Sequence, residues 1–192
     1  ANNCFAVGQA DGGEALYARW DGSQWKRVVP DSSVPDQNLY GVSCPGDNDC
    51  WAVGKRDSST LNISHWNGST WTRVNPAVAV NSHLYGVNCT SSNDCWAVGQ
   101  RKSGDVLLEH YNGTNWSRVL PTSGDPNQDL WAVNCANPNS CWAVGKSGAT
   151  LYYDGSTWVG VSNGDLPNDD YRAVAGIAPN PDFPVNALWE ET

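Results

Sequence analysis

The sequence predicts an all-β fold, a four-bladed β-propeller made of four-stranded repeats of about 45 residues. Three observations support this prediction. One block of sequence recurs in phase along the chain, each block divides into four short strand-like segments, and the two chain ends supply complementary parts of one further block. A β-sandwich does not repeat its sequence in this way, so a sandwich or a solenoid is the weaker alternative.

The recurring block combines an aromatic start, a cysteine pair and a glycine turn. Residues 39–76 read LYGVSCPGDNDCWAVGKRDSSTLNISHWNGSTWTRVNP. Residues 84–121 read LYGVNCTSSNDCWAVGQRKSGDVLLEHYNGTNWSRVLP, and residues 130–163 read LWAVNCANPNSCWAVGKSGATLYYDGSTWVGVSN. All three markers keep their order and phase, so the similarity reflects true repetition.

Each block divides into strands A to D. In residues 39–76 these strands are LYGVSC, CWAVGK, TLNISHW and TWTRV, which are rich in aromatic and β-branched residues. Asn-Gly-Ser, Asn-Gly-Thr or Asp-Gly-Ser joins strand C to strand D, and these residues favour a tight hairpin turn. Strands A and B are apolar on both faces, as expected for a sheet that lies between two neighbouring sheets.

The chain ends determine the predicted blade count. The chain opens with CFAVGQ, EALYARW and QWKRVV, which match strands B, C and D, while the missing strand A matches YRAVAGI at residues 171–177. We therefore expect velcro closure by the C-terminal strand 171–177. The predicted propeller spans residues 1–178, with blades at 1–38 plus 171–177, 39–83, 84–129 and 130–170. Residues 179–192 form a C-terminal tail.

The cysteine spacing predicts one local disulfide in each of three blades. Zinc requires four ligands that converge on one point, whereas these pairs lie a blade apart without histidine at ligand spacing. Disulfides indicate an oxidising compartment, so the expected location is extracellular, secreted or on the cell surface. Cys4 is left over, either unpaired or in an intermolecular bond. The predicted pairs are Cys44–Cys50, Cys89–Cys95 and Cys135–Cys141.

The charge of the chain argues against several partner classes. A net charge of −9 without a basic stripe disfavours nucleic acid and anionic membrane surfaces. The sequence has no 18-residue apolar run for membrane insertion. No Ser-His-Asp spacing stands out, so we expect no enzyme, no cofactor and no metal. Asx-turn hydrogen bonds explain Asp47, Asp49 and Asp94 in the A–B turns, with calcium at Pro-Gly-Asp-Asn-Asp as a weaker alternative.

The combined pattern of SC-x5-CWAVG followed by HWNGSTW resembles tandem β-propeller repeats of secreted and surface proteins of bacteria. The resemblance covers Cys4 to about Val174 and implies a surface or secreted propeller without a known activity. A weaker resemblance connects Trp-Asn-Gly-x-x-Trp to blades of propeller lectins. The chain departs from the bacterial pattern at Gly176, where a cysteine is expected, and in the tail that follows.

The second residue of each strand A marks a candidate ligand mouth. In a propeller the B–C and D–A loops share one face, while the disulfides and glycine turns share the other. Loops on a rigid scaffold commonly carry binding sites. The aromatic residues either plug the narrow channel of the ring or stack on a sugar. The candidate residues are Tyr40, Tyr85, Trp131 and, in the fourth place, Arg172.

Aromatic residues at the start of strand B are the predicted core. Trp51, Trp96 and Trp142 occupy equivalent positions, with Phe5 in the first blade, and we expect them to pack between blades. Five Asn-x-Ser/Thr sequons are candidate glycosylation sites. They begin at Asn62, Asn67, Asn88, Asn112 and Asn115.

The tail provides the functional hypothesis. Residues 184–190, PVNALWE, have the composition of an additional strand, and their apolar side chains Val185, Leu188 and Trp189 are candidates for self-association. The sequence therefore predicts a non-enzymatic extracellular structural or adhesive module that binds copies of itself through its tail, with a filament as one form of that assembly. A carbohydrate-binding lectin is the alternative, with glycans as partners.

Overall fold

The computed structural model describes residues 4–32, 34, 38–55, 61–75, 82–101, 104–123, 128–162, 164 and 169–176. Strands dominate these residues, and one short 3₁₀ turn, Lys146–Gly148, lies in the fourth repeat. None of the described segments is a helix long and apolar enough to cross a membrane.

The strands form four antiparallel sheets in sequence order, which we call blades 1 to 4. Blade 1 has three strands, β1 (Cys4–Gln9), β2 (Ala15–Trp20) and β3 (Trp25–Val28). Blade 2 has four, β4 (Asn38–Gly46), β5 (Asp49–Lys55), β6 (Leu61–Trp66) and β7 (Trp71–Val74). Blade 3 contains β8 (Ser82–Ser91), β9 (Asp94–Arg101), β10 (Val106–Tyr111) and β11 (Trp116–Val119). Blade 4 contains β12 (Leu130–Asn137), β13 (Ser140–Gly145), β14 (Thr150–Tyr153) and β15 (Trp158–Gly160).

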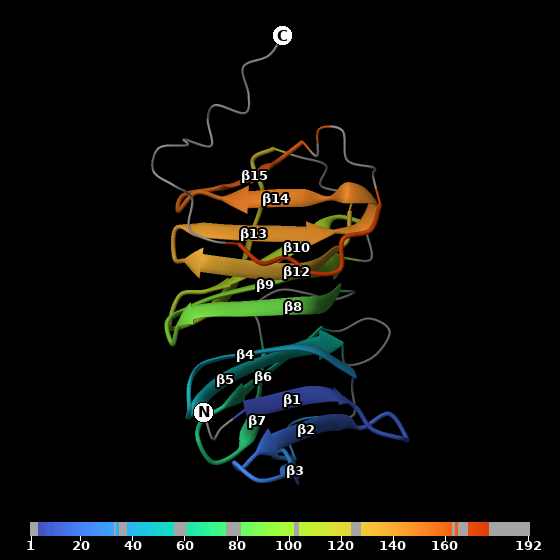
Figure 1. Cartoon of the computed structure of the whole chain (residues 1–192), viewed down its shortest axis with the longest axis vertical. Coiled ribbons are helices and arrows are strands. Elements are labelled where there is room, and N and C mark those ends of the chain that lie inside the picture. The colour runs from blue at the N-terminus through green and yellow to red at the C-terminus, as the bar shows by residue number, and fades with distance from the viewer. Residues whose placement is uncertain are drawn as a thin grey trace.

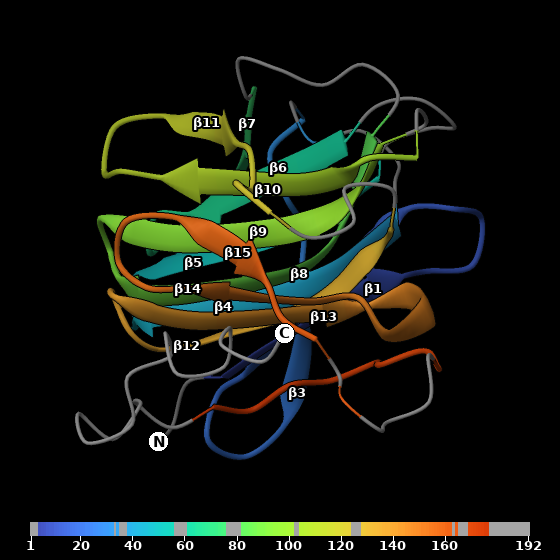
Figure 2. The same cartoon turned by 90° about the horizontal axis from the view of Figure 1, so that it is seen from above.

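The blades stack face to face along the long axis of the molecule, with blade 1 at one end and blade 4 at the other (Figure 1). Seen from above, the sheets overlie one another (Figure 2). Each interface between blades holds one apolar cluster. The strand patterning predicts this arrangement, because a sheet that is apolar on both faces must bury both of them.

The aromatic residue near the start of strand B packs into these clusters in blades 1 to 3, where it is Phe5, Trp51 and Trp96. The Trp51 ring of blade 2 lies 4.6 Å from Tyr111 and 5.2 Å from Trp116 of blade 3, between ring centroids. Trp96 makes the same pair of contacts with Tyr153 and Trp158 of blade 4. The prediction that these tryptophans pack between blades is confirmed for Trp51 and Trp96, which are 3% and 2% exposed.

The innermost strands of neighbouring blades approach closely. A Cβ atom placed on Gly86 of β8 would lie 3.0 Å from the carbonyl oxygen of Trp131 and 3.2 Å from the Cα of Ala132, both on β12. Gly41 meets the backbone of β8 in the same way. Glycine is needed here because backbone atoms of the next blade occupy the space of a side chain.

The turns and disulfides follow the sequence prediction. Gly68, Gly113 and Gly155 adopt φ between 89° and 95° in the C–D turns, a conformation that glycine tolerates without strain. A Cβ on Gly68 would lie 3.0 Å from Asn48 in the A–B turn, so the two kinds of turn share one face. Cys4 is exposed and free. The three predicted disulfides, Cys44–Cys50, Cys89–Cys95 and Cys135–Cys141, are present.

The four sheets do not close into a ring. The predicted closing strand does not pair with β1, and residues 171–176 instead lie beside β12 and β13 at the opposite end of the molecule (Figures 1 and 2). The Asn134 side chain accepts a hydrogen bond from the Gly176 N–H at 3.0 Å. Ser43 and Asn88 make the equivalent bonds to the N–H groups of Cys89 and Cys135 in the next blade. Residues 171–176 thus occupy the position of the innermost strand of a blade that would follow blade 4.

Candidate functional site

The predicted mouth residues lie at equivalent positions on successive inner strands. Tyr40 of β4 and Tyr85 of β8 are in contact, with ring centroids 5.4 Å apart and planes tilted by 49°. The Arg172 guanidinium lies 3.5 Å from the centroid of the Trp131 ring, which is a close cation–π contact. The structure therefore brings the four residues together as two adjacent pairs.

Polar groups surround the tyrosine pair. The Tyr85 hydroxyl donates to the Gln100 side-chain oxygen at 3.1 Å. The Asn38 amide donates to the Tyr40 hydroxyl at 3.4 Å. Burial raises the pKa of Tyr85, and the nearby Asp129 carboxylate and Tyr40 raise it further. The phenol of Tyr85 therefore stays protonated and continues to act as a hydrogen-bond donor.

A carboxylate completes the mouth. Burial raises the pKa of Asp129, with a smaller opposing effect from Lys146 and a further rise from Asp170. The Lys146 N–H donates to the Asp129 carbonyl at 2.9 Å, and the Ser147 N–H donates to the Asp170 carboxylate at 3.1 Å. Aromatic faces, amides and carboxylates in one place suit a neutral polyhydroxy ligand. Arg172 covers one face of Trp131, however, which also fits the plugging role.

Two histidine–carboxylate pairs lie on the opposite face, and the sequence interpretation of their aspartates is wrong. The His65 Nε2 lies 2.7 Å from the Asp49 carboxylate, and His110 pairs with Asp94 at the same distance. His110 also stacks on Trp96, with ring centroids 4.3 Å apart. Asp49 and Asp94 thus bind histidine across the sheet instead of only supporting Asx turns. The sequence carries a signal for this, because blade 4 replaces both partners together, with Ser140 and Tyr152.

One buried carboxyl was not predicted as a functional residue. Glu109 on β10 is fully buried, and neither of its carboxyl oxygens has a hydrogen-bond partner. Burial raises its pKa to about 7, with a partial opposing effect from Arg118 on the neighbouring strand. Among the described residues, no group of three or more His, Cys, Asp or Glu side chains could hold a metal ion.

The sequons differ in their accessibility. Asn67, Asn112 and Asn115 are exposed at the C–D turns and remain candidate glycosylation sites. Asn62 is fully buried, and its side-chain oxygen accepts a hydrogen bond from Ser64 at 3.2 Å. The Asn62 side chain is therefore inaccessible in the folded chain, and glycosylation at this sequon stays a prediction. Asn88 is partly buried, and its side chain bonds to the Cys135 N–H.

The predicted tail contacts lie outside the described residues. Val185, Leu188 and Trp189 belong to residues 177–192, and self-association through the tail stays a prediction.

The repeated four-stranded sheets and their stacked inner strands define an all-β fold of the β-propeller class. No family model matches the chain, and no curated protein matches it in sequence. The resemblance to tandem repeats of secreted bacterial proteins therefore stays a prediction.

Solved β-propellers share the fold. The chain is similar to a fungal lectin from Aleuria aurantia described as a six-bladed β-propeller, with TM-score 0.63 and 12% identity over 86% of this chain and 59% of that chain. It is similar to the SapL1 lectin in complex with α-methyl fucoside, with TM-score 0.61 and 15% identity over 87% of this chain and 60% of that chain. It is also similar to YCF48 bound to D1 peptide, with TM-score 0.53 and 18% identity over 81% of this chain and 49% of that chain.

These neighbours are lectins and another propeller protein, and at this identity they show the fold alone. The chain spans about half to three fifths of their length. The six-bladed lectin shows that blades of this class also form rings larger than four.

Proposed function

We propose that this chain is a non-enzymatic, extracellular structural or adhesive module that associates with copies of itself. The single observation behind the proposal is the uncovered outer face of blade 1. Trp25 on this face is 52% exposed, whereas its equivalents Trp71, Trp116 and Trp158 are at most 2% exposed. An apolar blade face that is buried in every other repeat points to a partner blade.

Smaller residues of the same face repeat the pattern. Cys4 and Ala6 are exposed on β1. Their equivalents in blade 2, Cys50 and Ala52, are 1% and 0% exposed. The composition of the face is thus that of an interior interface, and an open sheet edge lies beside it. Open edges with apolar neighbours favour pairing with another chain.

A charge placed on this face tests the proposal. We expect the Trp25→Lys variant to lower the association state seen by sedimentation velocity, because a lysine must be desolvated at a packed interface. The matched control is Leu120→Lys, since Leu120 is 62% exposed and belongs to the interior blade 3. A wild-type chain that stays monomeric at high concentration would contradict self-association.

Carbohydrate binding is the second candidate function. It is favoured by Tyr40, which is 42% exposed at the mouth and lies beside the hydrogen-bonding groups of Tyr85. The Aleuria aurantia and SapL1 lectins have been solved in complex with α-methyl fucosides, which makes fucosides the first ligands to test. If the mouth is the site, Tyr40→Ala abolishes glycan-array binding while Trp25→Lys leaves it intact. An unchanged array signal in Tyr40→Ala removes the mouth as the site.

A further inference from the structure

We propose that residues 171–176 of one copy complete blade 1 of a second copy by pairing with β1. The proposal rests on the self-association above and names the segment that provides it. Among the described residues, blade 1 has no counterpart of the innermost strand of blades 2, 3 and 4, while residues 171–176 occupy an innermost position and belong to none of the four sheets. Each end of the molecule thus holds the part that the other end lacks.

Gly8 provides independent support for a missing strand. In blades 2 to 4 the equivalent glycines are Gly54, Gly99 and Gly145, and a Cβ on any of them would lie within 2.0 Å of a carbonyl oxygen in the innermost strand or directly before it. A Cβ on Gly8 would meet no described residue within 4 Å. Blade 1 therefore keeps the glycine that makes room for a strand, although none of the described strands fills that room.

The register of blade 4 specifies the pairing. In blade 4, Leu130 lies opposite Gly145, Val133 opposite Ala143 and Cys135 opposite Cys141. The same register places Tyr171 opposite Gly8, Val174 opposite Ala6 and Gly176 opposite Cys4. It also places the Asp170 carbonyl in the open space beside Gly8. In blade 4 the Asp129 carbonyl has the equivalent position beside Gly145.

The aromatic contacts between blades are complementary at the two ends. In blades 1 to 3 the aromatic residue near the start of strand B packs on two rings of the next blade, as Phe5 does on Trp66 and Trp71 with ring centroids 5.2 and 5.4 Å apart. Trp142 of blade 4 finds no such pair among the described residues. Blade 1 presents a pair of this kind, Trp20 and Trp25, 5.8 Å apart.

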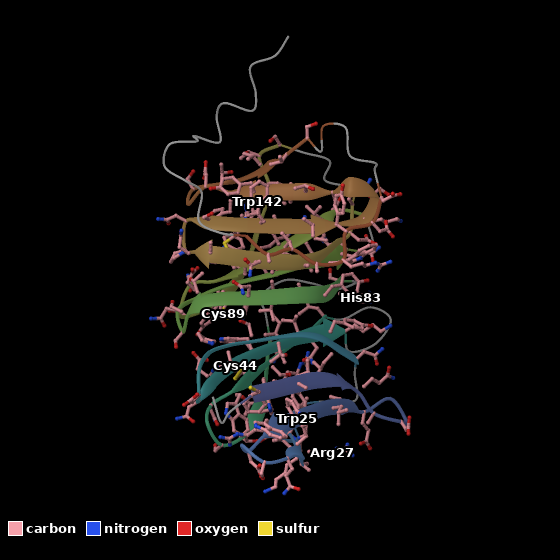
Figure 3. All side chains as sticks on the ribbon, viewed as in Figure 1. Trp25, Arg27, Cys44, His83, Cys89 and Trp142 are labelled. Carbon is pink, nitrogen blue, oxygen red and sulfur yellow. A yellow bond between two sulfur atoms is a disulfide. The ribbon has the colours of Figure 1, made fainter. Side chains whose placement is uncertain are left out.

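Trp142 and Trp25 lie at opposite ends of the molecule (Figure 3), so they can meet only between copies. Blade 4 of one copy therefore stacks on blade 1 of the next, while its residues 171–176 add the fourth strand to that blade. The contact joins two different surfaces, so it propagates from copy to copy.

A new disulfide tests the register directly. In Gly176→Cys, oxidised glutathione should accept the two electrons of the Cys4 thiol and the introduced thiol, forming a disulfide and two molecules of reduced glutathione. We expect covalent oligomers on a non-reducing gel and a peptide that links Cys4 to the introduced cysteine. Ala175→Cys, one position out of register, is the control and should give no such peptide.

A second variant tests the space beside Gly8. Because a Cβ meets nothing there, Gly8→Val should keep the melting temperature of the isolated chain, yet it should weaken association at least tenfold. Association that is unchanged in Gly8→Val, with no link to Cys4 in Gly176→Cys, would overturn the strand pairing and leave self-association standing. If the chain is monomeric, both proposals are overturned. This holds when the disulfide between Cys4 and the cysteine introduced at position 176 is absent, and also when it forms within one copy, as it would in a closed four-bladed ring.

Discussion

The Glu109 carboxyl lies at a position that the other blades fill with small or apolar side chains. Its equivalents on the third strands are Ala18, Ser64 and Leu151. Ser64 accepts a hydrogen bond from Tyr17 at 2.9 Å, whereas neither oxygen of Glu109 has a partner. An unpartnered buried carboxyl is costly when ionised, so Glu109 makes the interface between blades 2 and 3 sensitive to pH.

We predict that the free energy of unfolding falls as the pH rises from about 4.5 through 7. The folded-state pKa of Glu109 is raised to about 7 from 4.5, so over this range the folded chain keeps a proton that the unfolded chain releases. The stabilisation that comes from protonated Glu109 is fully present below the pKa of the unfolded state and is lost above the pKa of the folded state. The loss in the free energy of unfolding is on the order of 3 kcal/mol.

Chemical denaturation of the wild type, Glu109→Gln and Glu109→Leu between pH 4 and 8 measures this effect. In both variants the free energy of unfolding should no longer show the fall with pH that Glu109 causes. Glu109→Leu introduces the residue that blade 4 has at this position, Leu151, and should be the most stable of the three proteins at pH 8. A decline of equal size in all three proteins would assign it to other groups.

Trp96 is the residue at which we expect the largest loss of stability. It is 2% exposed and contacts His110, Tyr153 and Trp158. Trp96→Ala should lower the free energy of unfolding by about 3–5 kcal/mol, because it opens a cavity between blades 3 and 4. Tyr40→Ala, at an exposed position, is the control for thermal denaturation. Equal melting temperatures for Trp96→Ala and the wild type would show that this interface contributes little.

The strands and turns could be predicted because their signals are local. Trp-Ala-Val-Gly runs specify strands, Asn-Gly and Asp-Gly specify the hairpin turns, and cysteines six positions apart face each other across the A–B hairpin. The repeat period also assigned Tyr40 and Tyr85 to equivalent positions of neighbouring blades, and in the structure such positions of stacked blades lie side by side. The pairs Asp49–His65 and Asp94–His110 required knowledge of which strands are adjacent and in which register.

The angle between blades could not be predicted in this way. Counting four repeats suggested a closed ring, but closure depends on how far each blade rotates from the last. That rotation depends on tertiary packing, including the backbone contact at Gly86 and the tryptophan that enters each interface. The sequence identifies the parts of these contacts without fixing their geometry.

The close approach of the inner strands can be tested with one substitution and a matched control. In Gly86→Val the new side chain must displace the backbone of β12, so the free energy of unfolding should fall by about 1–3 kcal/mol. Gly8→Val makes the same change on β1, where a Cβ meets none of the described atoms within 4 Å, and should leave stability unchanged. Equal melting curves for the two variants would show that β8 and β12 can separate at little cost.

At the scale of the whole molecule, the two ends are different surfaces, which predicts polarity in the assembly. Blade 1 presents Trp20 and Trp25, while blade 4 presents Trp142 and residues 171–176. If these surfaces bind each other, blocking one end stops growth in one direction and leaves the other end functional. A symmetric contact between two copies of the same end has no such polarity.

Mixing two blocked variants distinguishes these cases. Trp25→Lys blocks the blade 1 end and Trp142→Lys blocks the blade 4 end, so each variant alone should be monomeric by sedimentation velocity. Together they should form a heterodimer of defined size, because the intact blade 4 of the first variant meets the intact blade 1 of the second. That complex has only blocked ends left and cannot grow further. If Trp142→Lys still dimerises by itself, or if the mixture stays monomeric while the wild type assembles, the head-to-tail contact between blades 4 and 1 is wrong.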